Sequence, residues 1–289
     1  MKTQSPKALL VTLLAAVLPQ LVHAHEHVAA GANSTSPGSP LILANAADYA
    51  DTSGYVFALD AGDPGSPYEG FYYTGDLVFA ALAATPALGG PEPLAAALGS
   101  HIDVVVESVE GPAGASFGFW ETAVDDVDST NLTWSLPVGL TNGTNHIYVS
   151  ENDGSAGADP YGHKHCRIYS VTLPGFYRVG FRFVDTSTNG PAGGPIQAPS
   201  ALFYLNLQAD LTIAAIAKSP GGLDIIYAAP SNLPDSGDGP ATNYQLESSP
   251  TLGPTAVWQP FGDLVLGDDH MHTNSLVPAA AQFFRLHAE

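Results

Sequence analysis

Polar and apolar residues alternate along much of the chain, and the alternation is clearest at residues 176–184. Side chains on a strand point to opposite faces in turn, so this pattern predicts a strand with one buried face. The turn-forming residues 173–175 come just before it and predict a hairpin with a strand expected at 167–172. The residues expected on the buried face are Tyr177, Val179, Phe181 and Phe183, and those on the polar face are Arg178 and Arg182.

Similar short apolar runs recur along the chain, each bounded by Gly, Pro, Asn or Asp, whereas helical periodicity is hard to find. We therefore predict an all-β protein: an antiparallel β-sandwich domain at 25–209, followed by a smaller fibronectin-like β-sandwich module at 210–289. The expected strands are 54–59, 77–82, 102–109, 116–120, 132–136, 146–150, 167–172, 176–184 and 202–207 in the first domain, and 211–217, 223–227, 244–248, 257–261, 264–266, 273–277 and 283–287 in the second.

Residues 1–24 have the pattern of a secretory signal peptide. Lys2 and Lys7 form a basic start, residues 8–18 are an apolar run, and Ala24 is a small residue before the expected cleavage point. The apolar run is too short to span a membrane, and no later run is longer, so we expect no integral membrane segment in the mature chain. The mature protein would begin at His25 and be exported to the periplasm, the cell surface or the medium.

The charge balance excludes one class of partner. The chain has 8 Lys+Arg against 28 Asp+Glu, a formal charge of −20, which becomes −22 when the two signal lysines are removed. Nucleic acids and anionic lipids need a basic surface, so we expect neither as a partner. An acidic surface instead attracts divalent cations.

Motifs for common enzymes are missing from the sequence, so we predict a protein that is not an enzyme. There is no nucleophile elbow of the G-x-S-x-G type, no H-E-x-x-H zinc helix and no phosphate-binding loop. The single cysteine, Cys166, excludes an internal disulfide framework and a C-x-x-C motif. On a strand it would point away from His165 and Arg167, and we expect it to be a buried core thiol.

Histidines carry the candidate chemistry. Residues i and i+2 of a strand share a face, so the two imidazoles of a His-x-His pair can converge on one ion. Zinc needs three or four ligands, and two pairs brought together would supply them. The sequence contains three such pairs, His25/His27, His163/His165 and His270/His272.

The other histidines are weaker candidates. His270 and His272 follow two aspartates in a polar loop, where an ordinary surface turn is the simpler interpretation. His101, His146 and His287 stand alone and are expected to be hydrogen-bonded or exposed rather than ligands.

The surroundings of His163 and His165 resemble a known group of proteins. The motif Gly162-His163-Lys164-His165, followed by residues 173–181, resembles the G-H-x-H…P-G-x-Y motif of bacterial surface-anchored "choice-of-anchor M" domains. The wider stretch at 25–209 resembles the Zur-repressed PEP-CTERM proteins. The segments that carry this resemblance are 25–27, 111–114, 117–121, 150–154 and 184–190.

This resemblance implies a zinc-binding protein made when zinc is scarce, serving zinc acquisition or buffering outside the cytoplasm, with a zinc transporter or a surface component as a possible partner. It implies His27, His163 and His165 as ligands, and His25 if cleavage exposes it. Glu121 could supply a carboxylate ligand or orient an imidazole. The sequence shows no match to the family's C-terminal membrane anchor, and we expect the 210–289 module to stand in its place.

Two alternatives remain open from the sequence. A mature N-terminal His25 could chelate Cu²⁺, as in copper-dependent histidine-brace oxidoreductases, because copper binds nitrogen sites more strongly than zinc does. Alternatively, the acidic loops 124–128 and 153–159 could bind calcium in a non-catalytic surface adhesion module.

Overall fold

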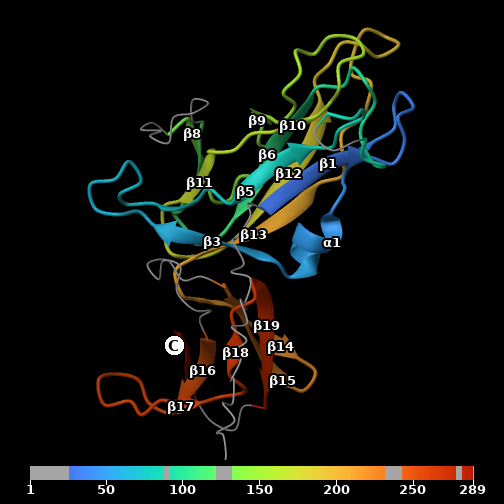
Figure 1. Cartoon of the computed structure of the whole chain (residues 1–289). Coiled ribbons are helices and arrows are strands. Elements are labelled where there is room, and N and C mark those ends of the chain that lie inside the picture. The colour runs from blue at the N-terminus through green and yellow to red at the C-terminus, as the bar shows by residue number, and fades with distance from the viewer. Residues whose placement is uncertain (1–25, 88–90, 122–131, 232–242, 278–281, 289) are drawn as a thin grey trace, which may run out of the picture.

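The computed structural model describes residues 26–87, 91–121, 132–231, 243–277 and 282–288. Figure 1 shows an all-β molecule, with a larger β-sandwich above a smaller β module. The only helices of the described ranges are α1 (Ala46–Tyr49) and the 3₁₀ turn η1 (Asp51–Ser53). No helix in these ranges is long and apolar enough to cross a membrane. The expected signal peptide, including His25, lies outside the described residues.

A nine-stranded sheet forms most of the larger sandwich. β3 pairs with β13 through one part of its length and with β4 through another, so the sheet curls around β3. Its strands, in spatial order, are β8 (Trp134–Pro137), β7 (Ser116–Trp120), β11 (Ile168–Val171), β4 (Tyr72–Thr74), β3 (Val56–Ala61), β13 (Phe203–Ala209), β12 (Gly175–Asp185), β6 (Ile102–Glu110) and β9 (Asn145–Tyr148).

A four-stranded sheet packs against the nine-stranded sheet. Phe79 of this second sheet contacts Phe181 of β12, with ring centroids 5.1 Å apart, and both side chains are buried in one apolar core. Burying a side chain of this size contributes about 1.5–3 kcal/mol, so such pairs hold the layers together. Its strands, in spatial order, are β10 (Gly162–His163), β5 (Leu77–Ala81), β1 (Glu26–Ala32) and β2 (Leu41–Leu43).

The alternation at β12 is confirmed. Its four apolar residues, Tyr177, Val179, Phe181 and Phe183, are fully buried in the core. On the opposite face Arg178 forms ion pairs with Asp51 and Glu110, and Arg182 forms one with Glu107. The period of two therefore identified both the strand and its buried face.

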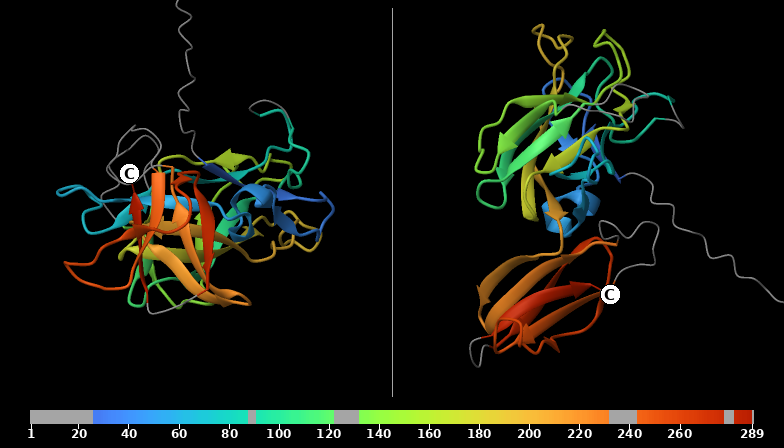
Figure 2. Two further views of the ribbon diagram at one scale, coloured as in Figure 1. Left: turned by 90° about the horizontal axis from the view of Figure 1, so that it is seen from below. Right: turned by 90° about the vertical axis from the view of Figure 1, so that its left-hand side faces the viewer.

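Residues 210–289 contain a second, smaller apolar core, built around Ile225, Tyr227, Ala229, Tyr244 and Leu246. One sheet here has the order β14–β15–β19, and in the other β16 pairs with β17, β18 and β20. The strands are β14 (Ile213–Ser219), β15 (Gly222–Ala229), β16 (Asn243–Ser249), β17 (Gln259–Pro260), β18 (Val265–Leu266), β19 (His270–Leu276) and β20 (Phe283–Ala288). Figure 2 shows this module at one end of the larger sandwich.

Backbone contacts join the module to the sandwich near its start. The N–H of Val56 donates to the carbonyl of Asp269 at 2.7 Å, and the N–H of Met271 donates to the carbonyl of Gly54 at 2.8 Å. Tyr55 and His270 form an isolated antiparallel bridge between these two bonds. The segment at 269–271 therefore lies against the sandwich.

Two features of the larger sandwich differ from the expectation. The sandwich is not wholly antiparallel, because β1 pairs with β5, and β3 with β13, in parallel. The expected hairpin across residues 173–175 does not form, since β11 pairs with β7 and β4 whereas β12 pairs with β13 and β6. The turn instead carries the chain from one part of the curled sheet to another, and the Tyr177 hydroxyl, which donates to the carbonyl of Leu173 at 2.6 Å, ties it down.

Candidate metal centre

The register of the four-stranded sheet brings two distant histidines to one face. β5 lies between β1 and β10, with His27 opposite Val78 and His163 opposite Ala80. Val78 and Ala80 are two residues apart and share a face, and residues opposite one another in a ladder also share a face. Since Phe79 points into the core, His27 and His163 both lie on the outer face of the sheet.

His165 completes a group of three imidazoles. One ring nitrogen from each of His27, His163 and His165 lies within 4.8 Å of the other two. The ring centroids are 5.4 Å apart for His27 and His163, 5.6 Å for His27 and His165, and 4.7 Å for His163 and His165. His163 is half-buried and the other two are exposed, so the group opens to solvent.

The three nitrogens fit a tetrahedral transition-metal ion. Zinc–nitrogen bonds of about 2.0–2.1 Å hold the ligand nitrogens about 3.4 Å apart in a tetrahedron. From separations of at most 4.8 Å, closure needs only rotations of exposed or half-buried side chains. Three protein ligands leave the fourth position for water or an exchanging ligand.

Tyr161 and Glu151 lie beside Nδ1 of His163. The Tyr161 hydroxyl lies 2.6 Å from His163 Nδ1, and a Glu151 oxygen lies 3.8 Å from the same atom. Burial, followed by the charge of Glu151, raises the pKa of Tyr161, so its phenol stays neutral. When Nδ1 carries the proton and donates to the phenol oxygen, Nε2 presents its lone pair for a metal, as outer partners of ligating histidines commonly arrange.

The turn between β10 and β11 holds His165 in position. Cys166, next in the chain, adopts the left-handed conformation with φ = 65°, which ends the extended backbone after His165. Arg167 follows and is buried, with its guanidinium stacked over the Tyr148 ring 4.5 Å away. The Lys164 ammonium lies over the same ring at 3.6 Å.

The expected burial of Cys166 is wrong, because this thiol is exposed. The expectation assumed that residues 165–167 continue as extended backbone into the strand expected at 167–172. β11 begins only at Ile168, so Cys166 sits on the turn with its side chain toward solvent.

Glu121 does not join the histidine group. Its two carboxylate oxygens accept hydrogen bonds from Arg167 Nε at 2.9 Å and Nη2 at 3.0 Å. The carboxylate thus supports the turn that carries His165 through Arg167, and the group of converging nitrogens contains the three histidines without it.

The pair His270/His272 lies on β19, with its nitrogens turned toward Asp268. His270 Nδ1 is 2.6 Å from the carbonyl oxygen of Asp268, and His272 Nε2 is 3.0 Å from its carboxylate. The two rings pack on separate tyrosines, His270 on Tyr55 and His272 on Tyr227. In the part of the chain that the structure describes, this pair gains no third converging ligand.

The described acidic loop 153–159 uses its oxygens to fix its own backbone. Asp153 accepts a hydrogen bond from the N–H of Ser155, and Asp159 accepts from the N–H groups of Ala84, Thr85 and Tyr161. Both carboxylates therefore stabilise local backbone, and calcium binding by this loop stays a prediction. The other acidic run, 124–128, lies outside the described residues.

Sequence reasoning missed Tyr161, Glu151 and Arg167 as supports of the histidine group. Tyr161 is two residues before His163, a spacing that places both side chains on one side of an extended segment and could have suggested contact. Nothing in the sequence indicates the contact between Glu151 and His163 or the pairing of Arg167 with Glu121, since each depends on the path of the chain between strands.

Comparison with known protein families found no family model that matches the chain. Comparison with curated proteins found no match either.

Proposed function

We propose that this chain is an exported, non-catalytic metal-binding protein that takes up Zn²⁺ through His27, His163 and His165. The observation that carries the proposal is the convergence of three imidazole nitrogens from two strands and a turn on one solvent-exposed face. Imidazole is a ligand for zinc, copper, iron and nickel, whereas magnesium and calcium prefer oxygen ligands. The donor set therefore favours a transition metal.

The openness of the group suggests that the metal is exchanged. Structural zinc sites are usually closed by four protein ligands, whereas three protein ligands leave a position for water or an incoming ligand. His27 and His165 are exposed, so an ion at this position can leave or pass to another protein. This property suits zinc acquisition or buffering under zinc limitation, with a zinc transporter or a cell-surface component as the receiving partner.

The resemblance to Zur-repressed PEP-CTERM proteins is the reason for proposing zinc among the transition metals. The acidic chain, at −22 without its signal segment, would raise the local concentration of any divalent cation near the histidines. Selectivity must then come from the nitrogen ligands and from metal supply, because copper binds such sites more strongly than zinc.

The test is a zinc titration of the mature chain, by calorimetry or by competition with a chromogenic chelator. We expect tight binding of one equivalent, in the micromolar range or below. The double variant His163→Ala/His165→Ala should lose it, and the matched control His270→Ala/His272→Ala should keep it. Absence of tight binding, or the same tight binding after His163→Ala/His165→Ala, would overturn the proposal.

A further inference from the structure

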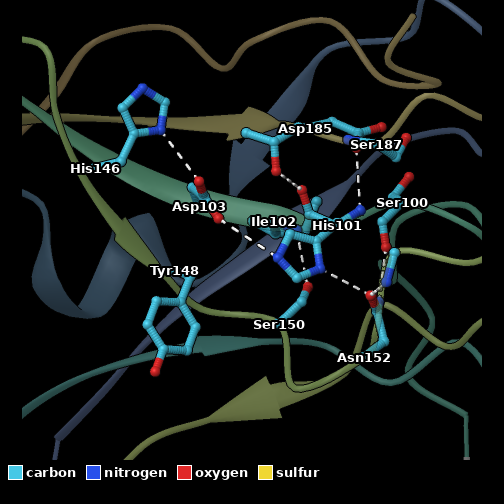
Figure 3. Close-up of polar contacts among 12 residues, drawn as sticks. Ser100, His101, Ile102, Asp103, His146, Tyr148, Ser150, Asn152, Asp185 and Ser187 are labelled. Atoms are coloured by element: carbon cyan, nitrogen blue, oxygen red, sulfur yellow. Dashed lines mark hydrogen bonds and ion pairs between the residues drawn. The ribbon is translucent and has the colours of Figure 1, made fainter.

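A second cluster of metal-ligand side chains lies on the nine-stranded sheet, where Asp103 of β6 stands between two imidazoles (Figure 3). His146 of β9 approaches one side, with Nδ1 3.1 Å from Asp103 Oδ2. His101, just before β6, approaches the other side, with Nε2 3.9 Å from Asp103 Oδ1. None of these side chains belongs to the three-histidine group.

Asn152 fixes which nitrogen of His101 carries the proton. Its amide Nδ2 donates to the carbonyls of Ser100 at 2.9 Å and Asp159 at 2.7 Å, and its Oδ1 accepts from the N–H of Gly154 at 2.8 Å. The same Oδ1 lies 2.8 Å from His101 Nδ1. An amide oxygen only accepts, so Nδ1 must donate. Neutral His101 therefore has its lone pair on Nε2, the atom that faces Asp103.

The carboxylate that Nε2 faces is also an acceptor. Asp103 is 9% exposed, and its Oδ1 is buried and accepts no hydrogen bond from the described residues. His146 Nδ1 donates to the other oxygen and so fixes the plane of the carboxylate, while the second ring nitrogen of His146 points away from it (Figure 3). Two lone pairs, on His101 Nε2 and Asp103 Oδ1, thus face each other across 3.9 Å, which is favourable only with positive charge between them.

We propose that His101 Nε2 and Asp103 Oδ1 bind a divalent transition-metal ion at a second site. In a tetrahedron, zinc bonds of about 2.0–2.1 Å to nitrogen and about 2.0–2.2 Å to carboxylate oxygen hold the two ligand atoms about 3.4 Å apart, so the observed 3.9 Å must shorten by about half an ångström when the metal binds. His146 is a positioning residue that orients the carboxylate, and Asn152 is one that orients the imidazole. With two protein ligands, this site binds more weakly than the three-histidine group, and it does not depend on that group.

The alternative source of positive charge is a proton on Nε2, which would give an imidazolium facing the carboxylate. Metal and proton compete for the same lone pair of His101 Nε2. The metal site and the protonated imidazole therefore predict different responses to added zinc. If a metal binds, zinc changes the state of Nε2 at neutral pH, whereas a site for a proton alone responds only to pH.

The experiment uses the full mature chain carrying His163→Ala/His165→Ala, which removes the first group, and Zn²⁺ as the probe. Equilibrium dialysis should show one weak equivalent of zinc. Adding His101→Ala or Asp103→Asn should abolish it, and adding His146→Ala should weaken it about 10–100-fold, as loss of an outer partner typically does. The matched control is His287→Ala, an exposed histidine on β20 outside both clusters, which should change nothing.

Nitrogen NMR of the imidazoles gives a second readout that does not depend on how each variant folds. Zinc should shift the His101 Nε2 resonance in the background chain and leave its Nδ1–H in place. The proposal is overturned if this chain binds no zinc, if binding survives both His101→Ala and Asp103→Asn, or if Nε2 responds to pH but not to zinc. Because the first group is already removed, these outcomes are independent of whether the three-histidine proposal succeeds.

Discussion

Two His-x-His pairs occupy different settings in the two regions of this molecule. His163/His165 lies where a strand ends in the four-stranded sheet, and a third imidazole, His27, reaches it from β1. His270/His272 lies within β19 of the smaller module, where both side chains turn to Asp268 and pack on tyrosines. The same motif thus gives a candidate metal centre in one region and a hydrogen-bonded pair in the other.

The difference comes from the neighbouring strands. β5 separates β1 from β10, and its register puts His27 and His163 on the same outer face. β19 instead pairs with β15, which places Tyr227 opposite His272. The His-x-His spacing therefore determines only that the two rings share a face. The residues on the neighbouring strands determine whether a third ligand lies close to them.

Replacing His27 with Ala should have the largest effect on zinc affinity. It leaves His163/His165 without a third imidazole, which is the situation of His270/His272 among the described residues. Zinc affinity should fall by more than the 10–100-fold that loss of an outer partner typically costs, since a metal–nitrogen bond is lost. Chelator competition measures the change, with His272→Ala as the matched control. Wild-type affinity in His27→Ala would show that the first pair works alone.

Glu121→Gln tests whether the carboxylate acts through Arg167 or as a ligand. Arg167 is buried, so weakening its ion pair should lower the free energy of unfolding of the metal-free chain by about 2 kcal/mol, less than for a fully buried pair because Glu121 is partly exposed. Zinc affinity should stay within about tenfold of wild type, the low end of the outer-partner range.

Chemical denaturation with and without chelator makes this measurement. The control is Glu107→Gln, which weakens the ion pair with Arg182 on another part of the sandwich. Loss of zinc binding in Glu121→Gln with unchanged stability would make Glu121 a ligand.

Tyr161→Phe should give a smaller effect. It removes the hydroxyl next to His163 Nδ1 but keeps the ring, so zinc affinity should fall about tenfold through loss of an outer partner. Tyr148→Phe is the matched control, because it keeps the ring that Lys164 and Arg167 contact. Equal affinities in the two variants would remove Tyr161 from the site.

Acid should destabilise the larger sandwich, which contains His163/His165, before the smaller module, which contains His270/His272. Burial raises the pKa of Asp185, but hydrogen bonds from the backbone N–H groups of Gln197, His101 and Ser187 outweigh it, and the pKa lies below its usual value. A lowered pKa adds stability that is complete above the unfolded value of about 3.9 and is lost as pH falls through the folded value.

Hydrogen exchange as a function of pH measures this loss strand by strand. Amides of β6 and β12 should lose protection at a higher pH than those of β15 and β19, and Asp185→Asn should reduce that difference. Equal loss of protection in both regions would contradict the role of Asp185.

The sequence was informative where strands are long and strongly patterned. Alternation in 176–184 predicted β12 to within a residue or two at each end, and 116–120 coincides with β7. The pairs His25/His27 and His163/His165 were also expected to converge, and the structure brings His27 to the other pair, whereas His25 lies outside the described residues.

The rest depended on features that have no local pattern. β1 contains mostly small residues, β2 has three residues and β10 has two, so three of the four strands that hold the histidine face gave no strand signal. The parallel pairing of β1 with β5 joins segments about fifty residues apart and cannot be read from either one. The left-handed Cys166 and the Glu121–Arg167 ion pair likewise follow from the turn that the fold imposes.

The most direct test is a crystal structure of the mature chain grown with one equivalent of zinc, with diffraction recorded on both sides of the zinc absorption edge. We expect the strongest anomalous peak among His27, His163 and His165, about 2.0–2.1 Å from one nitrogen of each. No peak among these three rings, or a stronger peak at His270 and His272, would contradict it.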